Sequence, residues 1–182
     1  NFIKSLNFNK KIFVTKSVGI IKPLSKKRFI SKKNKIKIVY IGRISREKNL
    51  ELLFKLIKSS SNLSLSIYGK DEEKLESNFN SSLRNKIKFK GSILNKKIRF
   101  EIKKYDLLIL PSKFEPWGLV IEEAIYNGIP VISSNKVGCY QDLISNLKVG
   151  FVFKNNSLGS LQKCIKKIQN LKNLKIINKN LS

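Results

Sequence analysis

The sequence contains no histidine and no methionine, and it has only two cysteines, Cys139 and Cys164. Without histidine, the chain cannot use an imidazole general base or a Ser-His-Asp triad. Two cysteines are too few for a disulfide scaffold or a zinc site. No apolar run approaches the ~18 residues that a transmembrane helix needs. Because even position 1 is not methionine, we expect a fragment or processed piece of a longer protein.

Common phosphate-binding signatures are missing as well. No Gly-x-Gly-x-x-Gly follows the first expected strand and no Gly-Lys-Ser/Thr loop occurs, which argues against a dehydrogenase or an NTPase. The chain also lacks an Asp-x-Asp pair of the kind that holds a divalent ion under a diphosphate. We therefore expect neither a metal nor a cofactor.

Acidic residues are scarce, and their distribution is uneven. The net charge is +26, yet 33 of the 38 basic residues are lysine, which a biased composition produces whatever the function. Residues 1–40 and 147–182 hold no acid, whereas residues 41–146 resemble an ordinary domain. The excess charge is therefore either a solvated surface or an attraction to anionic lipid or nucleic acid. Lipid is favoured over nucleic acid, because aromatic residues are not interleaved with the lysines.

Apolar runs and helical spacings alternate from residue 35 onward, and the hydrophobic share of the whole chain, 41%, supports a folded core. Strands are predicted at 36–41, 63–68, 87–89, 106–110 and 129–132. Helices are predicted from 50 to 57, over 72–84, over 95–104, over 119–127, briefly at Asp142, and along 158–168. This order predicts an α/β fold with a doubly wound, Rossmann-like parallel sheet over residues 35–182, preceded by a basic linker at 1–34.

Two cations follow the first strand, in the segment Gly42 to Asn49. Gly42 permits a tight exit from the strand, and Arg43 and Lys48 flank the start of the next helix. A planar guanidinium and a mobile ammonium can together grip a diphosphate without metal. The alternative is a solvated loop in a lysine-rich protein.

Two carboxylates eight residues apart surround a helix start beyond the strand at 106–110. Glu115 lies in the loop and Glu123 lies inside the helix, with the amides of residues 118–120 between them. A helix N-terminus binds anions, and a carboxylate can accept two hydrogen bonds from a diol. This arrangement suits the sugar, diphosphate and ribose of a sugar nucleotide. The alternative is that acids merely favour a helix N-terminus.

These segments occur together in a characteristic order. They are Gly42-Arg43…Glu47-Lys48-Asn49, Ile67-Tyr68-Gly69, Phe89-Lys90-Gly91, Pro111-Ser112…Glu115-Pro116-Trp117-Gly118-Leu119-Val120…Glu123-Ala124 and Gly128-x-Pro130-Val131-Ile132. In this combination, residues 36–153 resemble the C-terminal, donor-binding domain of retaining GT-B glycosyltransferases of family 4, the glycosyl transferases group 1 domain. The resemblance implies the C-terminal half of a GT-B fold.

The resemblance also implies roles for individual residues. Arg43 and Lys48 would neutralise the donor diphosphate, Glu115 would bind hydroxyls of the transferred sugar, and Glu123 would bind the ribose. The catalytic residues it implies are Arg43, Lys48 and Glu115, and the donor-binding residues are Gly42, Ile93, Trp117, Gly118, Leu119, Val120 and Glu123. Family members often have Gly-Gly and then Glu where this chain has Gly138-Cys139 and Asp142. That loop therefore departs from the pattern, and Cys139 is interpreted as a tolerated small residue.

The implied reaction is metal-independent, retaining transfer from a nucleotide-diphosphate sugar to a glycan or lipid-linked acceptor, in polysaccharide, lipopolysaccharide or capsule biosynthesis. A missing N-terminal domain would bind the acceptor, so this part alone would be an inactive hexosyltransferase fragment. We expect a cytoplasmic protein whose basic ends can contact the inner face of an anionic membrane. A nucleic-acid- or anionic-surface-binding module and a GT-B relative such as an epimerase are the alternatives.

Overall fold

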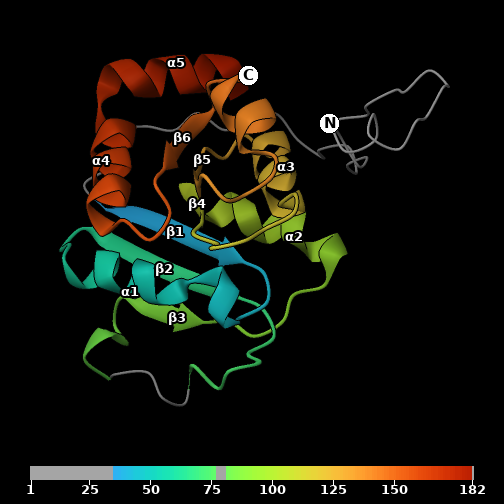
Figure 1. The fold of residues 1–182 in the computed structure, drawn as a ribbon, viewed down its shortest axis with the longest axis vertical. Helices are drawn as coiled ribbons and strands as arrows, with labels where there is room; N and C mark the ends of the chain where they lie inside the picture. Colours follow the sequence, from blue (N-terminus) through green and yellow to red (C-terminus); the bar gives the residue numbers. More distant parts are fainter. Residues whose placement is uncertain (1–34, 77–80, 182) are drawn as a thin grey trace, which may run out of the picture.

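The computed structural model describes residues 35–76 and 81–181, so the predicted linker at 1–34 lies outside the described residues. Strands and helices alternate along this part of the chain (Figure 1). The strands are β1 (Ile36–Ile41), β2 (Leu63–Tyr68), β3 (Ile87–Phe89), β4 (Leu107–Leu110), β5 (Val131–Ser134) and β6 (Gly150–Phe153). The α-helices are α1 (Leu50–Lys58), α2 (Asn95–Glu101), α3 (Leu119–Tyr126), α4 (Leu158–Gln169) and α5 (Leu171–Leu181). Shorter 3₁₀ segments are η2 (Arg46–Lys48), η3 (Ser81–Leu83) and η4 (Ile102–Lys104), and η5 (Tyr140–Ser145) is a π-helix.

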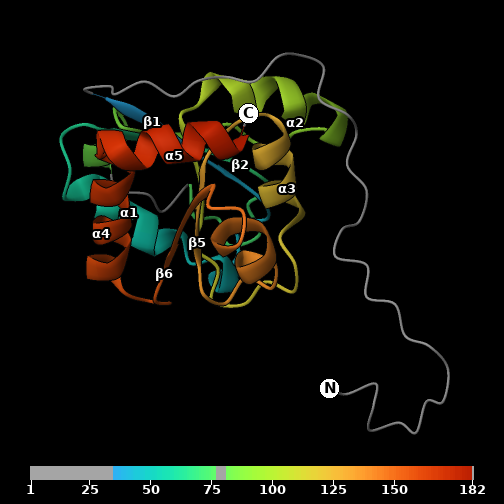
Figure 2. The same cartoon turned by 90° about the horizontal axis from the view of Figure 1, so that it is seen from above.

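The six strands form one parallel sheet in the order β3-β2-β1-β4-β5-β6. Helices α1 and α4 cover one face, and α2 and α3 cover the other (Figures 1 and 2). The predicted doubly wound, Rossmann-like sheet is therefore confirmed. Strand order reverses between β1 and β4, and in such sheets ligands bind beyond the carboxyl ends of the strands at this switch point.

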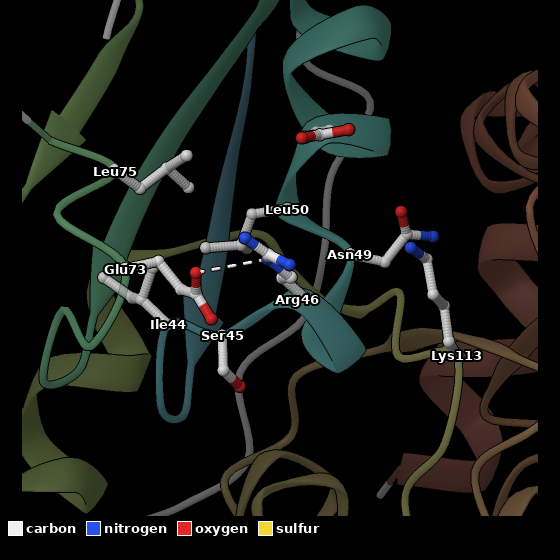
Figure 3. Close-up of a pocket in the computed structure, with 9 residues that line it drawn as sticks. Ile44, Ser45, Arg46, Asn49, Leu50, Glu73, Leu75 and Lys113 are labelled. Carbon is white, nitrogen blue, oxygen red and sulfur yellow. Dashed lines mark ion pairs between the residues drawn. The ribbon is translucent and has the colours of Figure 1, made fainter. Parts of the chain in front are cut away.

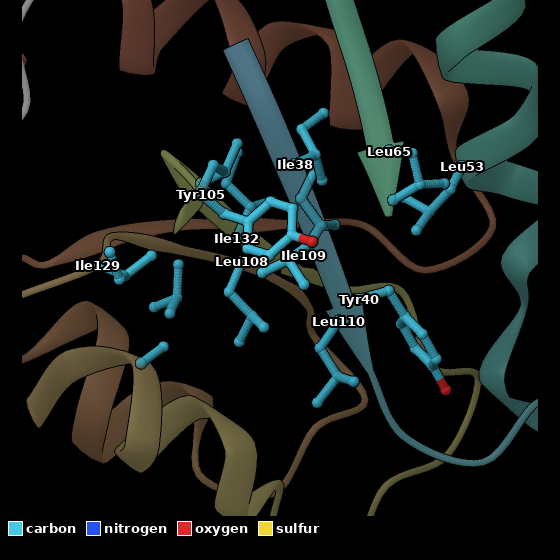
Figure 4. Close-up of a cluster of buried hydrophobic side chains, with 14 of the residues drawn as sticks. Ile38, Tyr40, Leu53, Leu65, Tyr105, Leu108, Ile109, Leu110, Ile129 and Ile132 are labelled. Atoms are coloured by element: carbon cyan, nitrogen blue, oxygen red, sulfur yellow. The ribbon is translucent and has the colours of Figure 1, made fainter. Parts of the chain in front are cut away.

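The centre of the sheet is buried on both faces. All four residues of β4 are at most 2% exposed, as its uninterrupted apolar run predicts. Their side chains pack with those of β1 and β5 into the cluster that Figure 4 shows, which includes Ile38, Ile109 and Ile132. A rigid sheet thus holds the loops at its carboxyl edge.

The predicted helix over 72–84 is wrong. Residues 72–76 form a turn, residues 77–80 lie outside the described residues, and only the 3₁₀ turn η3 follows. The carboxylate of Asp71 accepts hydrogen bonds from the backbone N–H groups of Glu73, Leu75 and Glu76, at 3.3, 3.0 and 2.9 Å. Lys74 adopts a left-handed φ of 51°. The aspartate therefore stabilises a local turn that competes with a helix.

The C-terminal part adds elements that the sequence analysis did not predict. Strand β6 extends the sheet and α5 follows α4, while β5 begins two residues later than expected. The predicted helix α4 is confirmed, with Ser157 capping its first turn through a hydrogen bond from Ser160 N–H. Its apolar stripe, which includes Leu161 and Ile165, is buried, so this helix covers the sheet.

Candidate functional site

The loops that leave β1, β4 and β5 are fastened together at the carboxyl edge of the sheet. Lys113 N–H donates to the carbonyl of Glu47 at 2.7 Å, which joins the first two loops. Gly138 N–H donates to the carbonyl of Glu115 at 2.8 Å, and Cys139 N–H donates to that of Trp117 at 3.1 Å. These bonds fix the backbone on both sides of the switch point.

A pocket of about 330 Å³ lies between the β1 loop and the start of α3. Its lining residues come from β1, β4 and the loops that follow them: Tyr40, Ile41, Gly42, Lys48, Leu110, Glu115, Pro116, Trp117, Gly118, Leu119 and Val120. Seven of the ten predicted site residues are in this set, and they come from segments about 70 residues apart in the sequence. We refer to it as the switch-point pocket.

Lys48 and Glu115 meet inside this pocket. Lys48 Nζ donates to Glu115 Oε2 at 2.8 Å, and the two side chains are only 10% and 20% exposed. Lys48 is the last residue of η2, and Asn49, with a left-handed φ of 56°, separates it from the start of α1. A largely buried ion pair is costly to break from one side, since the remaining charge is left without its partner. The pair therefore presents a cation and a carboxylate at fixed positions.

Arg43 does not line the pocket. Its side chain is 62% exposed and forms ion pairs with Glu72 at 3.6 Å and Glu47 at 3.9 Å. Its backbone is nevertheless fixed, because the buried Tyr40 hydroxyl donates to the Arg43 carbonyl at 2.6 Å. The two predicted cations thus start from one loop, but only Lys48 is brought to Glu115.

The N-terminus of α3 forms one wall of the pocket. Gly118 caps this helix with a left-handed φ of 96°, and a Cβ there would lie 2.9 Å from Val137 Cγ1. Leu119 and Val120 follow as its first helical residues, whose amides have no acceptor within the helix. Trp117 Nε1 donates to Glu122 Oε1, which holds the indole against the helix. Backbone donors of this kind suit an anion.

Glu123 and Ile93 lie outside the pocket lining. Glu123 is half-buried inside α3, where burial and, second, the neighbouring Glu122 raise the pKa of its carboxyl above the usual value. Ile93 lies in the loop after β3 and packs partly against the core. The structure therefore brings together Lys48, Glu115 and the start of α3, but not Arg43 or the residues assigned to ribose and base.

The structure adds three residues that sequence reasoning did not place in the site. Tyr40 forms part of the pocket, and burial raises the pKa of its phenol. Asn49 is buried and its amide donates to the Pro111 carbonyl at 3.3 Å. A Cβ on Gly138 would lie 1.9 Å from the Pro116 carbonyl oxygen. Asn49 already ends the segment Gly42 to Asn49 that carries the resemblance, whereas the roles of Tyr40 and Gly138 depend on contacts that no local pattern shows.

The cysteine in the loop after β5 is not accessible. Cys139 is fully buried, and burial raises the pKa of its thiol to about 12, so the thiol is protonated at neutral pH. Asp142 lies in the π-helix η5. Across residues 35–76 and 81–181, no three His, Cys, Asp or Glu side chains are grouped as metal ligands. In the same part of the chain, no helix is both long and apolar enough to cross a membrane.

A second pocket of about 320 Å³ lies beside the N-terminus of α1 (Figure 3). It is lined by Ile44, Ser45, Arg46, Asn49, Leu50, Glu51, Glu73, Leu75 and Lys113. Arg46 Nε pairs there with Glu73 Oε2 at 3.4 Å, with side chains 89% and 37% exposed. None of the predicted site residues lines this α1 pocket.

Comparisons with known proteins agree with this fold. An uncharacterized 41.2 kDa protein in the cps region of Klebsiella pneumoniae is 30% identical over 122 residues, which cover 66% of this chain and 33% of that protein. The crystal structure of WaaG, a glycosyltransferase involved in lipopolysaccharide biosynthesis, superposes with a TM-score of 0.69 at 22% identity, over 82% of this chain and 42% of WaaG. Anabaena HepE, solved in complex with UDP and glucose, superposes with a TM-score of 0.67 at 20% identity, over 81% of this chain and 42% of HepE.

The chain thus spans less than half of each of these proteins, and the solved structures support the GT-B fold. The family model for glycosyl transferases group 1 matches residues 22–180, which is most of the sequence. The chain belongs to the glycosyl transferases group 1 family.

Proposed function

We propose that this chain is the donor-binding part of a retaining glycosyltransferase, which transfers a sugar from a nucleotide-diphosphate sugar to a glycan or lipid-linked acceptor. The observation that carries the proposal is the Lys48–Glu115 pair, held at 2.8 Å beside the N-terminus of α3 in the switch-point pocket. A cation and free backbone amides suit a diphosphate, and a fixed carboxylate suits sugar hydroxyls. The complex of HepE with UDP and glucose supports this ligand class.

Lys48 and the first amides of α3 bind the diphosphate in this proposal. Arg43 joins them by exchanging Glu72 and Glu47 for a phosphate oxygen. Exposed ion pairs at 3.6 and 3.9 Å contribute little, so this exchange costs little. Glu115 accepts hydrogen bonds from the transferred sugar, and its position is maintained by Lys48.

The proposed chemical step breaks the bond between the anomeric carbon and the diphosphate oxygen. The acceptor hydroxyl oxygen forms the new glycosidic bond on the same face, and its proton passes to the departing phosphate. Lys48 and Arg43 stabilise the negative charge that develops on the leaving diphosphate, which is the usual role of preorganised cations. We propose that the reaction needs no metal ion.

The acceptor site is proposed to lie in a further domain, because the chain spans only a third of its Klebsiella relative. This part alone is then inactive in transfer but able to bind donor. The capsule-region relative and the lipopolysaccharide role of WaaG support a glycan or lipid-linked acceptor.

Calorimetric titration of the chain with UDP, GDP, ADP and their sugar conjugates tests donor binding. We expect saturable binding of one nucleotide class, unchanged by EDTA and lost in the Lys48→Met and Glu115→Gln variants. The Phe114→Ser variant, altered at an exposed loop residue, serves as the control. The assignment would be contradicted if the parent and both variants bound every nucleotide with the same affinity and if salt weakened this binding.

Arg43→Ala tests the catalytic part in a longer protein that contains this chain. We expect kcat for sugar transfer to fall about 100- to 1,000-fold, which corresponds to ~2.7–4 kcal/mol in the barrier. Because the side chain is 62% exposed, thermal stability should not change. Near-normal turnover would remove Arg43 from the mechanism while leaving donor binding by Lys48 intact.

A further inference from the structure

Helix α2 presents a basic outer face with an exposed aromatic side chain at its centre. Lys96, Phe100 and Lys104 follow one another at four-residue spacing, and Lys97 lies beside them. The three lysines are exposed, and Phe100 is 51% exposed. Just before the helix, Leu94 is 60% exposed. We refer to Leu94, Lys96, Lys97, Phe100 and Lys104 as the α2 face.

The packing of α2 does not account for this face. Ile98 and Ile102, on the opposite side, are 6% and 0% exposed and attach the helix to the core. Figure 2 shows α2 at the periphery of the molecule beside α3. The guanidinium of Arg99 lies 5.0 Å from the centre of the Phe100 ring, which adds a further cation next to the aromatic side chain.

One acidic side chain on α2 offsets part of this charge, at Lys104. Glu101 is the one acid between residues 90 and 105. Its carboxylate accepts a hydrogen bond from the Tyr68 hydroxyl at 2.9 Å and pairs with Lys104. Glu101 is thus shared between the buried Tyr68 and Lys104, and the outward positions at 96, 97 and 100 keep their positive and apolar character.

Helix α4 provides a contrast within the same molecule. Its exposed positions carry Lys163, Lys166 and Lys167, yet it has no large hydrophobic side chain exposed. A basic composition alone therefore produces a lysine face such as that of α4. The α2 face differs in combining lysines with exposed Leu94 and Phe100, and this combination suits the boundary between phosphate headgroups and acyl chains.

We propose that the α2 face docks on an anionic phospholipid bilayer. Phe100 and Leu94 enter the headgroup boundary, and the lysines lie at the level of the lipid phosphates. The contact is independent of the switch-point pocket. It also differs from a contact through the basic ends of the chain, because it depends on one uncharged aromatic side chain.

Vesicle co-sedimentation tests the proposal. The chain should bind vesicles in which about a third of the lipid is phosphatidylglycerol and should not bind pure phosphatidylcholine. Phe100→Ser leaves the charge unchanged and should lower partitioning about ten-fold, as expected for losing partial burial of an aromatic ring. Phe114→Ser, at a residue 66% exposed in a different loop, is the matched control and should leave partitioning unchanged.

A pair of triple variants separates the α2 face from net charge. Replacing Lys96, Lys97 and Lys104 by Gln should lower partitioning roughly 100-fold, since each lysine near the surface contributes about a five-fold factor. The same replacement at Lys163, Lys166 and Lys167 removes equal charge and should have a much smaller effect. All the replaced side chains are exposed, and circular dichroism melts check that each variant folds.

The proposal is overturned if Phe100→Ser partitions like the parent, or if the two triple variants lose equal binding. A third result would also overturn it. If the parent binds poly(U) RNA and the α2 triple variant does not, while Phe100→Ser binds vesicles as strongly as the parent, the face is assigned to nucleic acid. A Phe100→Trp variant gives an independent readout. The tryptophan fluorescence of this variant should shift to shorter wavelength with phosphatidylglycerol vesicles only, and the fluorescence of the parent, which comes from Trp117, serves as the reference.

Discussion

Two ion pairs lie on either side of the β1 loop, and they differ mainly in burial. Lys48 and Glu115 are 10% and 20% exposed in the switch-point pocket, whereas Arg46 and Glu73 are 89% and 37% exposed at the α1 pocket. Exposed pairs contribute little to stability, while breaking a buried pair from one side is costly. Two cations that lie two positions apart in the sequence, Arg46 and Lys48, thus form an ordinary surface contact and a largely buried pair, respectively.

Among the variants that test this comparison, Lys48→Met should lower stability the most. It leaves the Glu115 carboxylate partly buried without its cation, so the free energy of unfolding should fall by about 3 kcal/mol. Urea denaturation measures this change, and nucleotide titration should show loss of donor binding in the same variant. In the Lys48→Met/Glu115→Gln double variant, part of the stability should return. If the free energy of unfolding of Lys48→Met lies within ~0.5 kcal/mol of the parent's, burial does not distinguish the two pairs.

Glu123→Gln should have an intermediate effect that depends on pH. The pKa of Glu123 is raised in the folded protein by burial and by Glu122, so its contribution to stability is present at low pH and lost as pH rises through that pKa. Gln has no charge to bury. The melting temperature of the variant should therefore match the parent near about pH 4 and exceed it at neutral pH. Equal melting temperatures at both pH values would place the carboxylate in water.

Arg46→Ala should have the smallest effect. The lost pair is exposed, so the free energy of unfolding should change by less than about 1 kcal/mol, and nucleotide affinity should not change. Raising the salt concentration should reduce even this difference, because exposed charges are screened. A loss comparable to that of Lys48→Met, measured by the same denaturation, would show that the α1 pocket is as important to the fold as the switch-point pocket.

The sequence predicted the central strands best, because their pattern reflects burial directly. The bounds of β1, β2 and β3 agree with the prediction, and the apolar run of β4 is buried on both faces as expected. The helix predicted over 72–84 failed because the hydrogen bonds of Asp71 stabilise a turn that charge and spacing do not show. Strand β6, which was not predicted, is an edge strand in which only Phe153 is fully buried, so burial leaves a weaker pattern there than in the central strands.

The site was predicted where its residues belong to short, ordered segments. Lys48, Glu115 and Gly118 lie together in the switch-point pocket as expected. The direction of a long exposed side chain is set by its neighbours in space, and for this reason the sequence did not predict that Arg43 turns toward Glu72. The assignments of Ile93 and Glu123 to base and ribose stay predictions.

The close approach at Gly138 couples two loops that are separate in the sequence. Any side chain at this position would place its first carbon 1.9 Å from the Pro116 carbonyl oxygen, so the backbone of residues 115–118 would have to move. Position 138 therefore cannot be varied without moving the segment 115–118. Transplanting one of these segments from a relative should succeed only when the other is exchanged with it.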